Sequence, residues 1–475
     1  MKRISEDWLA VCLGLFLFAL SLASFLGVDA LGWAVSTSVW TNPAKMLSPA
    51  SKAYASLSPY LSLLLTYLFL LAILTAGARA LRLDLGRFIK GFTAVFMAAY
   101  ASWMLGSWAY IAATPDKRAS FHIGWSLNLT NEAGYIVALI LGLIVGNFLP
   151  ALATRMKEAI RPELYIKTAI VILGGFLGIT AAEQLGLATS VMFRGVCAIV
   201  EAYLIYWAVV YYVARRYFKF SREWSAPLAS GISICGVSAA IATGSAIRAR
   251  PIVPVMVSSL VVIFAVVEIL VLPFAAQTFL AHQPMVAGAW MGLAVKTDGA
   301  AVTSGAMAES LLSAKALADF GIRYKPGWIM GVTTTVKVFI DVFIGIWAFI
   351  LAWIWSAKIE PQKGTKVKAV EIWQRFPKFV LGYLATFAVI LGIGLLAPGL
   401  VPKAKAAMAQ ANVFRGIFFV MTFFTIGVVS DFRKLWQEGI GKLALVYILC
   451  LFGFIIWIGL AISWVFFHGV TPPIA

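Results

Sequence analysis

The chain has 475 residues, of which 62% are hydrophobic and 12% are charged, and its formal net charge is +18. Soluble domains carry about 25% charged residues, and they do not repeat apolar runs of roughly 20 residues, the length that crosses a bilayer. Such runs recur along this whole chain. The composition therefore excludes an ordinary soluble protein and predicts an all-α polytopic membrane protein. A β-barrel would show alternating segments of roughly 10 residues instead.

The positive net charge fits a membrane protein, because Lys and Arg accumulate in cytoplasmic loops. We therefore expect the lipid bilayer as a partner and no nucleic acid. When alternate loops are assigned to the side of the N-terminus, that side holds the larger share of the 38 Lys and Arg residues. The asymmetry predicts a multi-pass protein of the cell (inner) membrane, with its N-terminus cytoplasmic and its C-terminus external.

Thirteen candidate membrane spans can be read along the chain. Their approximate bounds are 8–28, 58–77, 91–113, 134–152, 165–182, 191–213, 226–247, 252–280, 284–310, 327–356, 377–397, 412–429 and 441–467. We predict that residues 1–130, with about three spans, form an N-terminal extension without signs of chemistry. Residues 131–475, with about ten spans, form the transporter core, and a basic cytoplasmic loop lies at 358–378.

The stretch APLASGISICGVSAAIATGSAIRAR at 226–250 is unsuited to a lipid-facing span. From Ser230 to Ser245 it is rich in Gly and in hydroxyl side chains, and it contains no aromatic residue. Breakable, Gly-rich backbone survives in a membrane only when it is packed in protein or lines a wet cavity. We expect an interrupted helix that forms half of a solute site. The substrate-binding candidates in it are Ser233, Cys235, Gly236, Ser238, Thr243 and Ser245.

A second stretch of this kind is GLAVKTDGAAVTSGAMA at 292–308. An ionised side chain at the centre of a membrane helix costs about 2.5–3.5 kcal/mol, and Lys296 and Asp298 would both incur this cost. Residues two apart on a helix do not face each other, so even a Lys296–Asp298 ion pair requires a broken helix. The substrate-binding candidates here are Lys296, Thr297, Thr303 and Ser304, and Asp298 is the ion-coupling candidate.

The two stretches resemble each other, since CGVSAAIATGSAI (235–247) and DGAAVTSGAMA (298–308) both run from Gly through small residues and hydroxyls to a second Gly. Secondary transporters place discontinuous helices from two inverted repeats around one midplane site. We therefore predict inverted repeats with discontinuous crossing helices. The bounds of the repeats are not defined by the sequence.

A third polar stretch, TTTVKVFID at 333–341, carries Lys337 and Asp341 on one helix face, where they could neutralise each other. Equally, Lys337 could bind substrate and Asp341 could couple an ion, and both interpretations stay open. Glu201 and Glu268 are lone acids in predicted spans, and no role is assigned to them. The four Cys and three His residues lack metal-ligand spacing, so no metal or cofactor is expected.

These motifs resemble a known family. ICG followed by Ser238 and Ala239, the segment that begins at Asp298, and Lys337 are similar to the YeiH-type sulfate exporter membrane family. Further similarity lies in KTAIVILGGFLGIT (167–180), RFPKFVLGYLA (375–385) and FFTIGVVSDFRKLWQEG (423–439), so that roughly 134–465 is covered. The chain departs from the family where Thr297 precedes Asp298 in place of a His. The resemblance implies a fold related to the cation/proton antiporter and anion transporter group.

The sequence thus predicts a secondary active transporter that exports a small anion, sulfate or an organic or sulfonate-type anion, coupled to a proton or sodium gradient. The N-termini of broken helices suit an oxyanion, because they present free N–H groups and a partial positive charge. A sodium/proton-type cation antiporter is the alternative. An intramembrane enzyme is less well supported, because the chain lacks Ser/His/Asp and HExxH constellations. The oligomeric state stays open, a homodimer included.

Overall fold

The computed structural model describes residues 4–113, 117–127, 133–183, 185–196, 198, 200–359, 377–430 and 441–475, except for residue 251. The side chains of residues 237, 238, 255, 259, 262, 345, 356 and 357 also lie outside the description. Four features of the sequence analysis lie wholly or largely outside the described residues: the predicted basic loop at 358–378, the end of the segment 423–439, Cys197 and the Ser238 side chain. The described chain forms two compact units.

The first unit comprises Met1–Ala188, Ser313–Arg323 and Lys378–Val429. A β-hairpin pairs Val35 with Pro49 in antiparallel register. The helices and strands of the first unit are α1 (Glu6–Leu22), β1 (Val35–Thr37), β2 (Leu47–Pro49), α2 (Pro59–Ala80), α3 (Leu85–Gly106), α4 (Ala109–Ala112), α5 (Ala133–Phe148), α6 (Pro150–Met156), α7 (Pro162–Glu183), α19 (Phe379–Leu396) and α20 (Val401–Val429).

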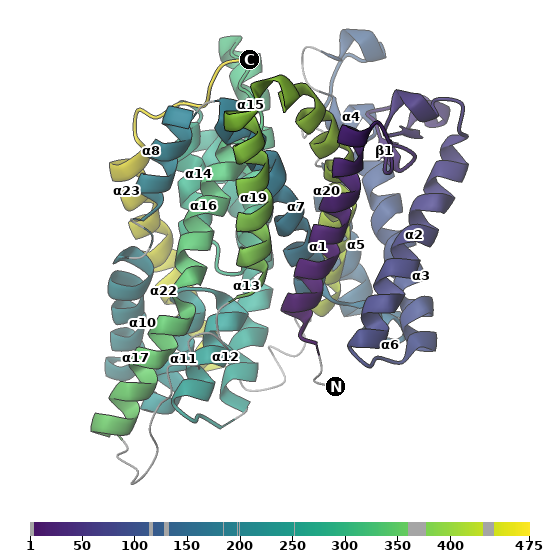
Figure 1. Ribbon diagram of the computed structural model, residues 1–475. Helices are drawn as coiled ribbons and strands as arrows, with labels where there is room; N and C mark the ends of the chain where they lie inside the picture. Colours follow the sequence, from purple (N-terminus) through teal and green to yellow (C-terminus); the bar gives the residue numbers. More distant parts are fainter. Residues whose placement is uncertain are drawn as a thin grey trace. The chain divides into compact units, whose positions relative to one another are not determined.

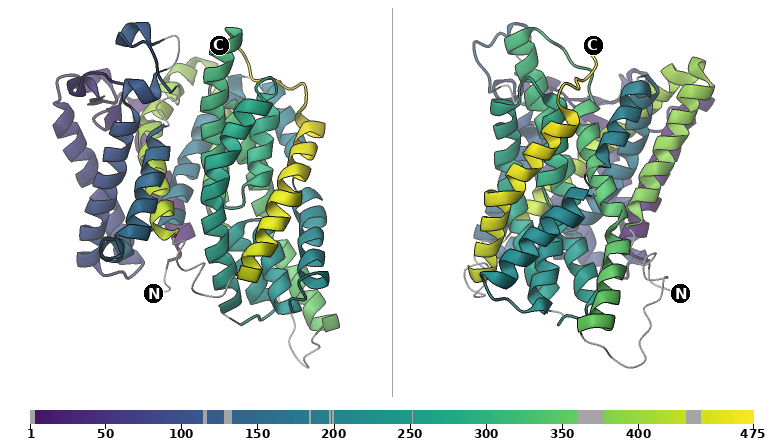
Figure 2. Two further views of the ribbon diagram at one scale, coloured as in Figure 1. Left: turned by 180° about the vertical axis from the view of Figure 1, so that it is seen from behind. Right: turned by 90° about the vertical axis from the view of Figure 1, so that its left-hand side faces the viewer.

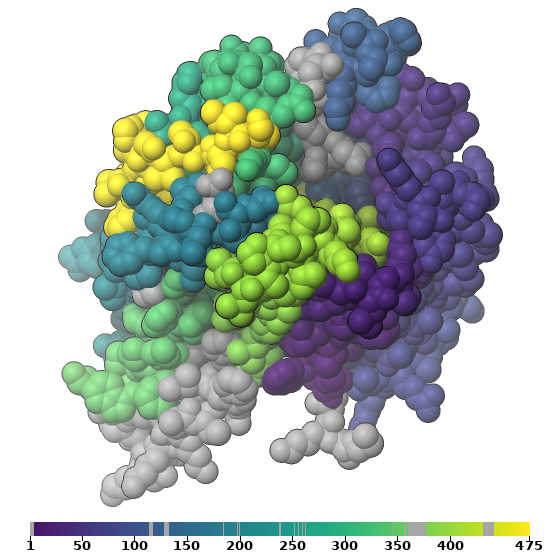
Figure 3. Space-filling model, turned by 45° about the horizontal axis from the view of Figure 1, so that its top comes forward, coloured from purple at the N-terminus to yellow at the C-terminus, as the bar shows by residue number. Residues whose placement is uncertain are grey.

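Close helix packing and a charge network hold this unit together. A Cβ on Gly142 of α5 or on Gly427 of α20 would run into backbone of the facing helix, so these helices approach as closely as small residues allow. At the start of α7, the Lys167 ammonium lies 2.8 Å from Asp7 of α1 and 3.2 Å from Glu163. The yellow-green surface in Figure 3 is the end of α19 and the start of α20. Leu396, the last residue of α19, is 89% exposed.

The second unit comprises Thr189–Leu312, Tyr324–Pro377 and Ser430–Ala475, and most of the predicted site residues belong to it. Its helices are α8 (Leu185–Gly195, which begins in the first unit), a π-helix (Val200–Tyr206), α10 (Trp207–Arg216), α11 (Arg222–Ser233), α12 (Gly236–Ala246), α13 (Ile252–Phe279), α14 (Pro284–Ala294), α15 (Asp298–Phe320, which ends in the first unit), α16 (Trp328–Val342), α17 (Ile344–Ile354), α22 (Gly441–Cys450) and α23 (Ile456–Phe467). Figure 2 shows α22 and α23 as one continuous rod in yellow.

Among the described residues, ten helices are long and apolar enough to cross a membrane. An eleventh is counted if Ala133–Phe148 and Pro150–Ala159, bent by 111°, make one span. The predicted all-α membrane protein is confirmed, and thirteen was an approximate count of its spans. The two additional predicted spans, 226–247 and 284–310, contain no uninterrupted membrane-spanning helix, because each consists of two helices joined at a break.

Candidate functional site

The first break lies at Ile234 and Cys235, between α11 and α12, as the Gly-rich sequence predicts. The chain folds back at this break. Thr243 donates a hydrogen bond to the Ser230 hydroxyl at 2.7 Å, whereas residues 13 apart would be about 20 Å apart on a continuous helix. At the open end, Arg250 donates to both carboxylate oxygens of Glu223. Residues 222–246 therefore form a helical hairpin, with α11 and α12 side by side in Figure 1.

The second break lies at residues 295–297, between α14 and α15, and it is also a hairpin. The Thr333 hydroxyl of α16 donates to the Gly288 carbonyl at 2.7 Å, and a Cβ on Gly305 would lie 2.5 Å from that same hydroxyl. Gly288 and Gly305 would be about 25 Å apart on a continuous helix. Residues 284–320 are therefore a second hairpin. Both predicted interruptions are confirmed, but the chain reverses at each of them, so the spans predicted at 226–247 and 284–310 are wrong.

The two hairpins approach from opposite ends of α13. The first leads directly into the start of α13, and the second follows directly after its end. Both tips lie beside the middle of α13: a Cβ on Gly236 would run into Val261, and the Lys296 amide donates to Glu268 at 3.0 Å. The tips meet there, since the Gly236 amide donates to the Lys296 carbonyl at 2.6 Å. Opposed half-length elements that meet midway are the arrangement of solute sites in secondary transporters.

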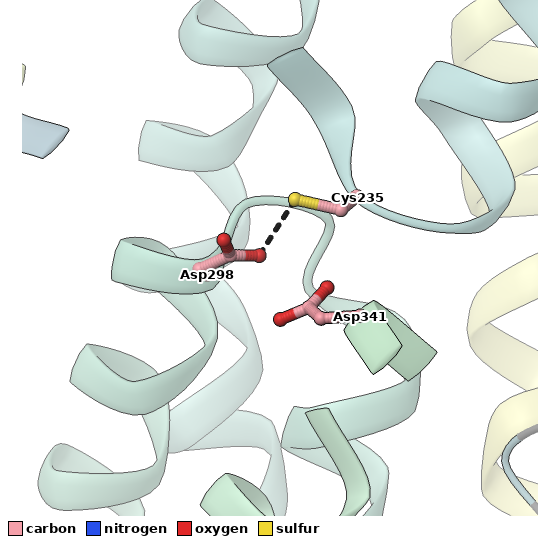
Figure 4. Close-up of side chains that lie close together, drawn as sticks. All are labelled: Cys235, Asp298 and Asp341. Carbon is pink, nitrogen blue, oxygen red and sulfur yellow. Dashed lines mark hydrogen bonds between the residues drawn. The ribbon is translucent and has the colours of Figure 1, made fainter. Parts of the chain in front are cut away.

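Four buried side chains meet where the tips touch, and we name Cys235, Asp298, Lys337 and Asp341 the tip centre. Figure 4 shows Cys235, Asp298 and Asp341 pointing toward one another, with the thiol donating to Asp298 Oδ1 at 2.6 Å. Lys337 of α16 donates to the Ile234 carbonyl of the first tip at 2.9 Å and to the Lys296 carbonyl of the second at 3.4 Å. Its ammonium lies 3.9 Å from Asp298.

The charges of the tip centre admit either an anion or a cation. The ligand atoms of Cys235, Asp298 and Asp341 lie within 4.8 Å of one another, which suits a small cation. Lys337 and the N-termini of α12 and α15 supply opposing positive charge, because both helices begin at the tips. One interpretation of the sequence paired Lys337 with Asp341 on its own helix, whereas the structure gives it an ion pair with Asp298 of α15.

The remaining predicted residues divide into buried hydroxyls without a partner and hydroxyls engaged elsewhere. Among the described residues, Ser233, Thr303 and Ser304 are buried and have no hydrogen-bond partner. Thr297 accepts from the Ala300 amide at 3.1 Å and so caps α15, and Thr243 bonds within the first hairpin. Ser245 is exposed near the far end of α12, so the structure does not bring it to the tips.

Glu268 and Glu201, to which the sequence assigns no role, both lie beside residues of the second hairpin. Glu268 of α13 accepts the Lys296 amide at 3.0 Å, and the Tyr447 hydroxyl donates to it at 3.5 Å. The Lys296 side chain turns away from Asp298, donates to the Leu293 carbonyl and lies 4.5 Å from the Tyr206 ring. The only sequence signal for these acids was their burial cost in predicted spans.

A helical membrane protein whose two opposed hairpins meet at buried charges has the architecture expected of a transporter. The sequence profile of a family described as "Conserved hypothetical protein 698" matches residues 118–446. The UPF0324 membrane protein NE0724 of Nitrosomonas europaea is 42% identical over 474 residues, 99% of this chain and 97% of its own. A UPF0324 membrane protein of Nitratidesulfovibrio vulgaris is 28% identical over 84% of this chain and 62% of its own.

The chain belongs to the UPF0324 membrane protein family. An uncharacterized protein of Archaeoglobus fulgidus is 50% identical over 170 residues, 31% of this chain and 91% of its own. No solved structure matches the chain. The comparisons therefore support a multi-pass membrane protein of this family.

Proposed function

We propose that the protein is a secondary active transporter that binds a small anion at the tip centre and couples its movement to a proton or sodium ion. The meeting of the two hairpin tips around Lys337 carries this proposal. Asp298 and Asp341 would leave the centre negative beside one lysine. A proton or sodium ion on these acids cancels that excess, and Lys337 with the two helix N-termini then attracts an oxyanion.

The buried hydroxyls near the tips support an oxyanion as the substrate. Ser233 ends α11 directly before the first break, and Thr303 and Ser304 lie in the first turns of α15. Their hydroxyls have no partner among the described residues, and leaving a buried polar group unpaired costs about 1–3 kcal/mol. Sulfate or a sulfonate is the anion class we propose, and export is the direction that the resemblance to the YeiH-type family favours.

The basic residues at the base of the first hairpin support the proposed cytoplasmic N-terminus. Because the first hairpin reverses, Arg248 and Arg250 lie at the same end as Arg222, close to the end of α10. This adds two basic residues to the side already richest in them and strengthens the predicted asymmetry. We therefore propose the inner membrane, a cytoplasmic opening for the first hairpin and an external one for the second.

Transport into proteoliposomes tests the proposal. We expect wild-type protein to take up labelled sulfate or a sulfonate, and Lys337→Ala and Asp298→Asn each to abolish uptake while the protein stays folded. Lys315→Ala is the control, because its partner Asp319 at 3.2 Å is a partly exposed surface residue. Wild-type rates from Lys337→Ala or Asp298→Asn would remove that residue from the mechanism.

The cation antiporter remains a second candidate because Cys235, Asp298 and Asp341 form a compact set of possible ligands. Internal pH in loaded vesicles separates the two candidates. Proton movement driven by sodium chloride would favour the antiporter, whereas movement driven by sulfate or sulfonate salts of an impermeant cation would favour the anion transporter. We propose no catalytic activity, and hydrolysis of a lipid or peptide panel by purified protein would overturn that.

A further inference from the structure

A second buried charged cluster adjoins the second hairpin, apart from the tip centre, and consists of Glu201, Glu268 and Lys296. Lys296 belongs to the break itself, Glu268 to α13 and Glu201 to the π-helix that precedes α10. All three side chains are at most 1% exposed. Lys296 links the three elements, because its amide donates to Glu268 and its ammonium interacts electrostatically with both carboxylates.

Glu201 is the least satisfied member of this cluster. Neither of its carboxylate oxygens has a hydrogen-bond partner among the described residues. A Cβ on Gly459 would lie 3.4 Å from its Oε1 and 2.6 Å from the Tyr206 hydroxyl, so α23 closes over the acid. The Tyr206 hydroxyl donates to the Ile455 carbonyl at 2.8 Å. Glu201 also lies in a π-helical turn, a feature frequent at functional sites.

The charge of the described interior does not balance without an additional positive charge. Among the described residues of the second unit, the buried ionisable carboxylates and ammonium groups are Glu201, Glu268, Asp298, Asp341, Lys296 and Lys337. Each cluster therefore has two acids and one lysine, one negative charge in excess. An uncompensated buried charge costs several kcal/mol, so each cluster needs one proton or cation.

A proton suits the second cluster better than a metal cation. Both oxygens of Glu268 already accept donors, from the Lys296 amide and the Tyr447 hydroxyl. Around Glu201 lie a tyrosine hydroxyl, an indole edge and the backbone of Gly459, which do not form a shell of ligand oxygens. The other titratable groups that act on the cluster are Tyr206, Tyr447 and Lys337.

We propose that Glu201, Glu268 and Lys296 form a proton-binding site separate from the tip centre, in which one of the two carboxylates holds the proton. The site is connected to the tips through Lys296, whose carbonyl accepts both the Gly236 amide and the Lys337 ammonium. Loss of the proton changes the field at the Lys296 backbone and hence at the contact between the hairpins. The proton site does not depend on the proposed function, whereas its coupling to transport rests on that function.

Infrared difference spectroscopy during a pH titration of the purified protein tests the proton site without any substrate. We expect wild type to show the carbonyl stretch of a buried protonated carboxyl at neutral pH. Glu201→Gln and Glu268→Gln should each remove or shift this band, and Glu201→Asp should shift it. Glu183→Gln, at an ion pair with Lys405 in the first unit, should leave it unchanged. Wild-type spectra from both Gln variants and from Glu201→Asp would overturn the proposal.

Vesicle measurements with labelled sulfate test the coupling separately. We expect Glu201→Gln to lower the number of protons moved per sulfate while sulfate still binds. If the infrared band is lost but that number equals the wild-type value, the proton site stands and its coupling role is wrong. If wild-type vesicles move no anion while the band behaves as expected, the proposed function fails and the proton site survives.

Discussion

Replacing Lys337 by Met removes an ammonium that donates to both hairpin tips, and its effect can be estimated from the structure. Lys337 is 2% exposed, lies 3.9 Å from Asp298 and donates to the Ile234 and Lys296 carbonyls. Removing one partner of a buried ion pair costs about 3–5 kcal/mol, because the other charge is left uncompensated. We expect Lys337→Met to lower the free energy of unfolding by about that amount.

A double-mutant cycle with Asp298→Asn isolates the electrostatic part of this loss. The double variant has no unpaired lysine or aspartate at these two positions, so it should be more stable than the sum of the single losses predicts. Groups in one network couple by about 0.5–3 kcal/mol. Unfolding in mixed micelles with increasing SDS, followed by tryptophan fluorescence, provides the required free energies.

Lys315→Met is the matched control, since Lys315 pairs with Asp319 across i,i+4 in side chains that are 34% and 45% exposed. Exposed pairs contribute only about 0–1 kcal/mol. If Lys337→Met were no more destabilising than Lys315→Met, or if the cycle were additive, Lys337 would not join the tips electrostatically and the estimate would be refuted.

Two further changes test the hairpins themselves. Gly236→Ala should destabilise the protein by about 1–3 kcal/mol, because the added Cβ would run into Val261. Gly453→Ala is the control and should be nearly neutral, because its Cβ would enter open space. Equal thermal unfolding temperatures for the two variants would contradict the contact between the first tip and α13. Hydrogen bonds from Arg250 hold the pKa of the Glu223 carboxyl below its usual range. The contact therefore stabilises the base of the hairpin at pH values above the usual pKa of a glutamate, and this contribution is lost as the pH falls through the lowered pKa. Glu223→Gln should flatten that part of the curve of unfolding temperature against pH, and an unchanged curve would show that the contact does not form.

The positions of both breaks could be predicted from sequence, because Gly and hydroxyl residues inside apolar spans are costly unless the backbone is packed or wet. The reversal at each break could not. A straight helix with a break and a helical hairpin have the same local composition. They differ in contacts between the two halves of the stretch, such as the hydrogen bond from Thr243 to Ser230, and composition does not show these contacts. The similarity of 235–247 to 298–308 did mark a structural equivalence, since both segments begin the second helix of a hairpin.

The candidate site was predictable in its charges and less so in its hydroxyls. Asp298 and Lys337 were singled out because ions are expensive in lipid, and the structure brings them together. Burying a hydroxyl in a membrane costs little free energy when it forms a hydrogen bond within its own segment, as Thr243 and Thr297 do. Composition therefore does not distinguish these two residues from Ser233, whose hydroxyl has no partner among the described residues. Glu201 and Glu268 were left aside because their common partner, Lys296, lies on another element and only folding brings them to it.

The central claim, that solute and coupling ion bind where the hairpin tips meet, is tested most directly at Cys235. In a chain with the other three cysteines, Cys12, Cys197 and Cys450, replaced by Ser, the rate at which a small permeant maleimide labels Cys235 can be followed in proteoliposomes that transport. We predict that the transported anion, or the coupling ion, slows labelling in proportion to its occupancy of the site. A labelling rate that is the same in every salt, in vesicles that do transport, would contradict a binding site at the tips.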